Sequence, residues 1–295
     1  MIAENEYAVT TYCVLNIFAC EMEPSGTWSW HCVVKNGARL HLAASFSDGF
    51  LQLAYRPDSI RKTTLALEDA MLCNKTLAGG VKLALDSSST GLHLSTDIVV
   101  LDEKQLMDQL EWALEGFHDG NRFLKSPASH KDYRISQVVP IPDVDLAELL
   151  RESSWPCAKR GQNDFSADLD ASGAPPASIR MSGNSLMLCV ELLRCNVSAD
   201  ITRQALATYL MTASCSLRKV RAYAERADEQ ICFGFLVSLP STSAAEEIQH
   251  ALAALSVAYR SCARETTVLL HGAAAQHYLT ARNSSTTDDQ PDKEN

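Results

Sequence analysis

Two stretches of the chain decide the fold, because they carry the same apolar pattern. Residues 67–100 read LEDAMLCNKTLAGGVKLALDSSSTGLHLSTDIVV, and residues 206–239 read LATYLMTASCSLRKVRAYAERADEQICFGFLVSL. The second stretch lies 139 positions after the first, with little residue identity. A duplicated fold retains the order and spacing of its apolar positions when only its core is constrained. The matching positions are Leu67 with Leu206, Met71 with Leu210, Val81 with Val220, Leu92 with Ile231, Leu94 with Phe233, Ile98 with Val237 and Val100 with Leu239.

The match continues into the next helical pattern after a small change of offset. The chain is therefore predicted to contain the same αβ unit twice, and its 295 residues suffice for two ordinary domains. At an offset of 142, Leu106, Leu110, Ala113 and Phe117 correspond to Ile248, Leu252, Leu255 and Tyr259.

The first copy opens with three predicted strands. Residues 28–34 are rich in apolar side chains and lead to Asn36-Gly37, a strong hairpin signal because both residues tolerate positive φ. Apolar residues then alternate with others over 40–46, and after the turn at 47–49 a third strand returns over 50–55. These residues predict an antiparallel meander.

A helix and a hairpin follow the meander. Asp58 or Ser59 is a suitable N-cap, and the helix is expected to end near Asn74. Apolar runs then predict strands over 81–85 and 92–101, separated by a polar turn.

The first copy closes with a second helix. Asp102 with Gln105 resembles a capping box at its start. Gly116 and Gly120 mark its predicted end.

The second copy repeats this order with a looser opening. A Gly/Pro-rich stretch over 173–176 replaces the tight Asn-Gly turn, and Ser243 with Glu246 forms a capping box before the last helix. The predicted elements are a helix over 143–152, strands over 165–169, 179–181 and 186–193, a helix over 198–211, strands over 220–224 and 231–239, and the helix after Ser243.

The predicted fold class is α+β, with two tandem α-βββ-α-ββ-α modules, each an antiparallel sheet packed with helices. The first module is expected over residues 1–125 and the second over residues 143–283. Residues 126–142 contain three prolines and form the predicted linker. Residues 284–295 are polar and are predicted to be a disordered tail.

Charge narrows the classes of partner. The net charge is −10, and it divides into −5 before Pro142 and −5 after it. An evenly acidic chain without a basic tract argues against nucleic acid and against an anionic membrane surface as the main partner. The apolar run near the N-terminus is short and flanked by Glu4, Glu6, Glu21 and Glu23, which does not fit a signal peptide or a membrane span. We therefore expect a cytoplasmic protein.

The ten cysteines are predicted to be reduced, and most of them to be buried. They include no CxxC pair, and most lie in apolar runs such as 187–190 and 231–233. Reduced cysteine serves as a small apolar residue in proteins of reducing compartments. Cys189 and Cys195 fall on or just after one strand and have no nearby histidine to complete a zinc site.

No residue pattern predicts a catalytic, cofactor or metal site. The eight histidines include no HExxH and no pair at i, i+4. Gly79-Gly80 lies between a helix and a strand and is not followed by GK[ST], so a helix C-cap explains it better than a phosphate loop. Gly183 lacks the GxSxG context of a nucleophile elbow.

Two further groups have structural interpretations. Trp28 and Trp30 share one face of a strand and are predicted to anchor the core or a domain interface. Five acidic residues are predicted to form a solvated helix face rather than an acid/base pair: Asp102, Glu103, Asp108, Glu111 and Glu115.

The order helix, three strands, helix, two strands, helix resembles the type III secretion chaperone-like fold, which secretion chaperones share with the YbjN-type family of bacterial proteins. The resemblance is closest over 70–117, where a helix ends in Leu-x-Asn at 72–74 and a hairpin, an apolar strand and a capped helix follow. The second copy has Ala213 in place of Asn74, so its resemblance rests on the order of elements.

The resemblance implies a non-catalytic module that binds a protein partner or pairs with itself, without a cofactor. Secretion chaperones of this fold are small acidic proteins that dimerise and let an effector segment wrap around them. A chain with two copies is expected to form such a pair internally, as a pseudo-dimer. The resemblance thus predicts a secretion-chaperone-like or assembly adaptor protein.

A second hypothesis stays open at this point. The chain is alternatively a small-molecule sensor or an unrecognised enzyme, with a ligand held between the two modules. The first hypothesis predicts an exposed apolar groove or sheet edge. The second predicts a concave pocket with convergent polar groups and perturbed titratable residues.

Overall fold

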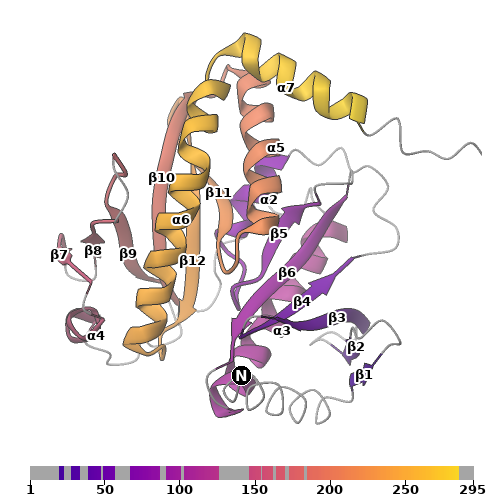
Figure 1. The fold of residues 1–295 in the computed structure, drawn as a ribbon, viewed down its shortest axis with the longest axis vertical. Helices are drawn as coiled ribbons and strands as arrows, with labels where there is room; N and C mark the ends of the chain where they lie inside the picture. The colour runs from indigo at the N-terminus through magenta and orange to yellow at the C-terminus, as the bar shows by residue number, and fades with distance from the viewer. Residues whose placement is uncertain are drawn as a thin grey trace, which may run out of the picture.

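The chain folds as an α+β protein with two antiparallel sheets packed with helices (Figure 1). The structure is a computed structural model. We call residues 20–125 the N-terminal half and residues 146–285 the C-terminal half. The structure describes residues 20–22, 28–33, 39–47, 49–56, 67–86, 91–100, 103–125, 146–153, 155–161, 164–169, 173–182 and 185–285.

The N-terminal half contains one six-stranded sheet and two described helices. Side chains alternate along its strands: Leu40 and Leu42 are buried, whereas Arg39 and His41 are exposed. The elements are β1 Cys20–Met22, β2 Trp28–Val33, β3 Arg39–Ser47, β4 Phe50–Tyr55, α2 Leu67–Asn74, β5 Lys82–Leu85, β6 Leu92–Val99 and α3 Glu103–Lys125.

The C-terminal half contains the second six-stranded sheet. Its described elements are α4 Leu146–Glu152, β7 Cys157–Lys159, β8 Asp164–Ala167, β9 Ala177–Ser182, β10 Ser185–Asn196, α5 Asp200–Ser216, β11 Arg221–Ala227, β12 Gln230–Pro240, α6 Ala245–Leu269 and α7 Gly272–Ser285. Helix α6 packs on β10 and β12, and α7 crosses α5.

The two sheets have the same strand order, which supports the predicted duplication. The order is β1-β2-β3-β4-β6-β5 in the first sheet and, read from the corresponding edge, β7-β8-β9-β10-β12-β11 in the second. Their registers correspond as well. Lys82 at the start of β5 pairs with Ser95, and Arg221 at the start of β11 pairs with Leu236.

The registers correct part of the predicted alignment. Val99 pairs with the first residue of β4 and Pro240 with the first residue of β10, so β6 and β12 correspond at an offset of 141 rather than 139. Leu94 therefore corresponds to Phe235, and the predicted match with Phe233 is wrong by two residues. A shift of two keeps the same face of the strand buried, which is why the apolar pattern concealed it.

The shift comes from the hairpin that precedes these strands. Six residues separate the equivalent ladder positions Leu85 and Leu92 in the N-terminal half. Eight residues separate Ala224 and Phe233 in the C-terminal half, where the two strands continue to a tight turn. The polar composition of both segments gave no sign of this difference in length.

Helix α3 does not end at its glycines as predicted but continues to Lys125. Both glycines face close neighbours. A Cβ on Gly116 would lie 2.2 Å from the carbonyl oxygen of Ala78, and a Cβ on Gly120 would lie 2.4 Å from a methyl group of Leu94. These glycines permit close packing of α3 on the first sheet and do not stop the helix.

Other predicted boundaries change as follows. Helix α5 extends past the predicted end at residue 211, strands β1 and β7 were not predicted, and α7 reaches into the predicted tail. The predicted capping box at Ser243 and Glu246 is shifted by one residue, because the Glu247 carboxylate accepts a hydrogen bond from the Ala244 N–H at 3.2 Å. The predicted linker over 126–142 and the predicted helix start at Asp58 or Ser59 lie outside the described residues.

The two halves pack reciprocally through equivalent elements. Helix α2 packs against β11, α5 packs against β5, and the two helices contact each other (Figure 1). Because α2 corresponds to α5 and β5 corresponds to β11, this arrangement is a pseudo-twofold interface within one chain.

Candidate functional site

Two buried cations join the halves at equivalent positions. Lys82 and Arg221 are only 2% and 1% exposed. The Lys82 ammonium donates to the carbonyl oxygen of Leu217 at 2.6 Å. The Arg221 guanidinium donates to the carbonyl oxygens of Leu77 and Val81 at 2.7 and 2.8 Å. Each cation thus binds the helix–strand connection of the opposite half, and this satisfies carbonyl groups that would otherwise be buried without a partner.

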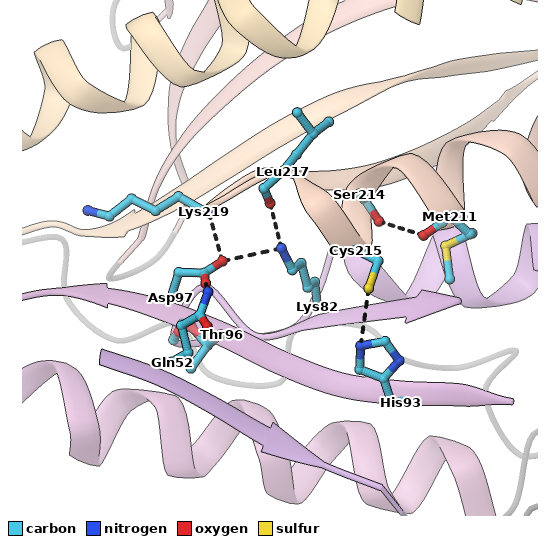
Figure 2. Close-up of polar contacts among 11 residues, drawn as sticks. Gln52, Lys82, His93, Thr96, Asp97, Met211, Ser214, Cys215, Leu217 and Lys219 are labelled. Atoms are coloured by element: carbon cyan, nitrogen blue, oxygen red, sulfur yellow. Dashed lines mark hydrogen bonds and ion pairs between the residues drawn. The ribbon is translucent and has the colours of Figure 1, made fainter. Parts of the chain in front are cut away.

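Asp97 on β6 accepts three hydrogen bonds, one of them from Lys82 (Figure 2). Its carboxylate lies 3.3 Å from the Lys82 ammonium, and it accepts the backbone N–H of Lys219 at 3.0 Å and the Gln52 side-chain amide at 3.0 Å. Burial alone would raise the pKa of Asp97, but the Lys82 charge and these hydrogen bonds outweigh it and hold the pKa below its usual value.

Arg221 has no such carboxylate within hydrogen-bond distance among the described residues. Ser238 stands where the register would place the counterpart of Asp97, since the offset here is 141. Burial lowers the pKa of Arg221 to about 10, which still leaves it a cation near pH 7. The interface is therefore symmetric in shape and asymmetric in charge.

Asn74, the residue of the Leu-x-Asn motif, also lies in this interface. Its amide donates to the carbonyl oxygens of Leu83 and Ala222 at 3.0 and 2.9 Å, and its oxygen accepts the Leu83 N–H at 2.7 Å. The asparagine thereby ties α2 to β5 within its own half and to β11 of the other half.

Ion pairs lie at the rim of the same interface. Glu68 of α2 accepts from Arg203 at 2.7 Å and from Arg226 at 3.0 Å. Lys75 and Glu225 form another pair at 2.6 Å. Contacts of this kind fix the register of two surfaces more than they add stability.

A groove lies where α5 meets the face of the first sheet that points away from α3. The floor is a row of small side chains on three neighbouring strands, Ala43, Ala54 and Ser95. Cys215 of α5 forms a wall. The groove has a volume of about 170 Å³, which is below the roughly 300–1,000 Å³ of typical small-molecule pockets.

Cys215 and His93 meet at one end of this groove (Figure 2). The Cys215 sulfur lies 3.8 Å from His93 Nε2. Burial, aided by the nearby charge of Arg56, lowers the pKa of His93 to about 4, and burial raises the pKa of Cys215. Near pH 7 the pair is therefore a neutral thiol beside a neutral imidazole, and it lacks the thiolate that a nucleophilic cysteine needs.

The burial of His93 has a consequence for stability that can be measured. The pKa of His93 is about 4 in the folded protein and 6.5 in an exposed histidine, so the unfolded chain binds this proton first as the pH falls. The free energy of unfolding should consequently fall as the pH drops from about 6.5 towards 4. Urea unfolding of His93→Gln at several pH values should show a flatter profile of unfolding free energy between pH 5 and 6.5. The parent should lose up to roughly 1.4 kcal/mol per pH unit that the variant does not lose. His277→Gln on the exposed face of α7 is the control, and an equal effect of both substitutions would contradict this account.

A smaller hollow lies between the halves on the other side of Asp97. Gly79 and Gly80 line it from the N-terminal half, and Lys219 and Glu247 line it from the C-terminal half. Its volume is about 30 Å³, which is the share of one water molecule. This hollow is too small for a metabolite in the conformation described.

Several sequence interpretations can be compared directly with the structure. Trp30 is buried at 2% exposure, as predicted for a core anchor, and Asp108, Glu111 and Glu115 are exposed on α3. The seven cysteines whose side chains are described are free, but only three are buried and four are half-buried, so the prediction that most are buried is wrong for this set. Within the described ranges no three metal-ligating side chains come together.

Gly79 and Gly80 have a role different from the predicted C-cap. Helix α2 ends at Asn74, and both glycines follow it in the left-handed region, with φ of 63° and 64°. They form the turn that leads into β5 and passes close to α3.

The sequence interpretation did not predict the polar residues of the interface between the two halves. The available signal was a single charged residue inside each of two apolar strands, Lys82 in β5 and Asp97 in β6. A charged side chain in a buried strand needs a partner. Nothing in the sequence identified Leu217 and Lys219 of the other half as the residues that Lys82 and Asp97 contact.

No family model matches the chain, and no curated protein is significantly similar to it. Among the helices of the described residues, none is long and apolar enough to cross a membrane.

Proposed function

We propose that this protein is a cytoplasmic, non-enzymatic protein-binding module of the type III secretion chaperone-like kind, whose two copies pair with each other as an internal pseudo-dimer. The observation that carries the proposal is the reciprocal packing of α2 on β11 and α5 on β5. A protein that dimerises through equivalent elements would use the same contacts between two chains. The adaptor role comes from the family resemblance and is part of the proposal.

The groove on the first sheet is the proposed binding surface. The interface between the halves is formed by α2, α5, β5 and β11. It does not cover β3 and β4 on the face of the first sheet that carries the groove. Ala43 is exposed there, and Ser45, Gln52 and Ala54 are half-buried. Small side chains allow the backbone of an extended segment to approach closely, and the groove is too narrow for a bulky metabolite.

A photo-crosslinking residue at position 43 tests this surface. Ala43 and Ser178 occupy equivalent places in the two sheets, each four residues before the turn that joins two paired strands. We expect an ultraviolet-dependent adduct with a polypeptide from position 43 and none from position 178. Electrophoresis followed by mass spectrometry of the adduct provides the measurement.

Filling the groove gives the matched control. Ala54→Trp should abolish the adduct from position 43, because the ring would cover the row of small side chains, while the melting temperature stays close to that of the unmodified protein. Equal adducts from positions 43 and 178, or an adduct that survives Ala54→Trp, would overturn the assignment of the surface.

A second candidate function is suggested by the polar end of the groove. His93 and Cys215 converge there, and the pKa values of both groups are shifted. Such convergence is expected of a site for a small polar ligand. A metabolite that raises the melting temperature of the parent protein but not of Ala54→Trp, together with no polypeptide adduct from position 43, would favour this candidate.

A further inference from the structure

Cys215 and His93 form a polar pair at one end of the groove on the first sheet (Figure 2). The Cys215 sulfur lies 3.8 Å from His93 Nε2, and both side chains line the groove. His93 is only 6% exposed, and its Nδ1 is buried without a hydrogen-bond partner in the described part of the chain. A thiol and an imidazole in such contact are two of the side-chain groups with which proteins bind soft metal ions.

Packing alone does not account for the imidazole. His93 on β6 pairs with Ala84 on β5, and the equivalent pair in the second sheet is Gly234 with Tyr223. A Cβ on Gly234 would lie 2.7 Å from the Tyr223 ring, so that ring occupies the space beside the glycine. Each sheet therefore has one ring at this pair of positions, and the packing sets its size. A ring nitrogen that faces a thiol is an additional property of the first sheet.

The spacing of the sulfur and the nitrogen suits a metal ion between them. Bonds of about 2.3 Å to sulfur and about 2.0–2.1 Å to nitrogen would span the 3.8 Å separation at an angle of about 120°. This is the angle of a three-coordinate ion, whose third position would face the groove. Within the described ranges no three histidine, cysteine or acidic side chains come together, so these residues do not supply the four ligands of a structural zinc site.

The charges around the pair favour a monovalent ion. Asp86 and Asp97 are the carboxylates whose charge acts on Cys215, and each is already paired with a cation, Arg56 at 3.2 Å and Lys82 at 3.3 Å. A thiolate and a neutral imidazole would leave a divalent ion with a net positive charge in a partly buried site, which is costly. The same two ligands form an electrically neutral site with a monovalent ion.

We propose that Cys215 and His93 bind Cu(I), a soft monovalent ion that thiolate and imidazole ligands accept. When the ion binds, the S–H bond of Cys215 breaks, a bond between sulfur and copper forms and the proton passes to solvent, with no change of oxidation state. The site goes beyond the proposed protein-binding function and does not depend on it, because it needs only the two side chains at the end of the groove.

Competition for Cu(I) with the chelator bathocuproine disulfonate, on the full chain under anaerobic conditions, tests the proposal. The parent should retain one Cu(I) per chain at chelator concentrations that remove the metal from Cys215→Ser and from His93→Gln. Each substitution should weaken binding by at least about tenfold, the lower end of the loss caused by removing an outer-shell partner of a metal ligand. X-ray absorption at the copper edge should show one sulfur and one nitrogen neighbour in the parent.

Cys157→Ser is the matched control, because Cys157 is also half-buried and no histidine acts on its thiol in the described part of the chain. It should leave Cu(I) binding unchanged, and the melting temperature of every variant shows that the fold is retained. The proposal is overturned if Cys157→Ser and Cys215→Ser weaken binding equally, which would mean adventitious binding by thiols. It is also overturned if Cys215→Ser has no effect, or if Zn(II) binds the parent more tightly than Cu(I).

Discussion

Asp97→Ala is expected to reduce the free energy of unfolding by about 3–5 kcal/mol, the range observed when one partner of a buried ion pair is removed. The Lys82 side chain is 3% exposed, so its ammonium would stay buried without a carboxylate. The N–H of Lys219 and the amide of Gln52 would lose their acceptor as well. Urea unfolding followed by circular dichroism gives the measurement.

An exposed ion pair provides the comparison. Asp164 pairs with Arg180, whose side chain is 65% exposed, and Asp164→Ala should cost less than about 1 kcal/mol. Similar losses for Asp97→Ala and Asp164→Ala would contradict the assigned role of Asp97.

The contribution of Asp97 also has a defined pH window. The pKa of Asp97 is depressed in the folded protein, so the stabilisation is complete above 3.8, the pKa of an exposed aspartate, and is lost as the pH falls through the folded pKa. The difference in free energy of unfolding between the parent and Asp97→Ala should therefore be constant above about pH 3.8 and shrink as the pH falls below it.

Gly79→Ala is the second substitution with a large expected effect, about 2–5 kcal/mol of lost stability from left-handed strain and overpacking together. A Cβ at this position would lie 2.2 Å from the Cα of Ala113 and 2.5 Å from the carbonyl oxygen of Trp112. Both contacts are with backbone, which cannot move away as a flexible side chain can. Thermal unfolding of the variant gives the measurement.

Gly80→Ala is the matched control, because its φ of 64° is almost the same as the 63° of Gly79. Its Cβ would meet nothing closer than the Thr96 hydroxyl at 3.4 Å. It should therefore lose only the left-handed strain, about 1–2 kcal/mol. If both substitutions cost the same, close packing against α3 is not what requires glycine at position 79.

The apolar pattern of the sequence predicted the α+β class and most strands, because burial of alternate residues is a local property of a strand. Phe50–Tyr55 was predicted with its observed bounds. The strands β1 and β7 were missed since three residues are too few to show a period of two. The end of α3 was misplaced because Gly116 and Gly120 serve contacts with distant residues, Ala78 and Leu94, that no local pattern records.

Local sequence patterns did not predict the interface between the two halves for a related reason. Lys82 and Arg221 look like isolated charges in apolar strands, and their partners lie 135 and about 140 residues away in the chain. The predicted alignment of the two copies places both residues at the same offset of 139, yet their side chains differ, so a search for identical residues does not find them. Their equivalence became visible only through the strand registers.

Each half contributes a buried cation that hydrogen-bonds to the other half, and this has a consequence for how the protein unfolds. If the halves separated, the Lys82 ammonium would lose its hydrogen bond to the Leu217 carbonyl, and the Arg221 guanidinium would lose both of its carbonyl acceptors. Two charged groups would then lie without partners on largely apolar surfaces. A state with one half folded and the other open would carry that desolvation penalty without the contacts that offset it. The two sheets should accordingly melt as a single cooperative unit, although each has a complete set of six strands.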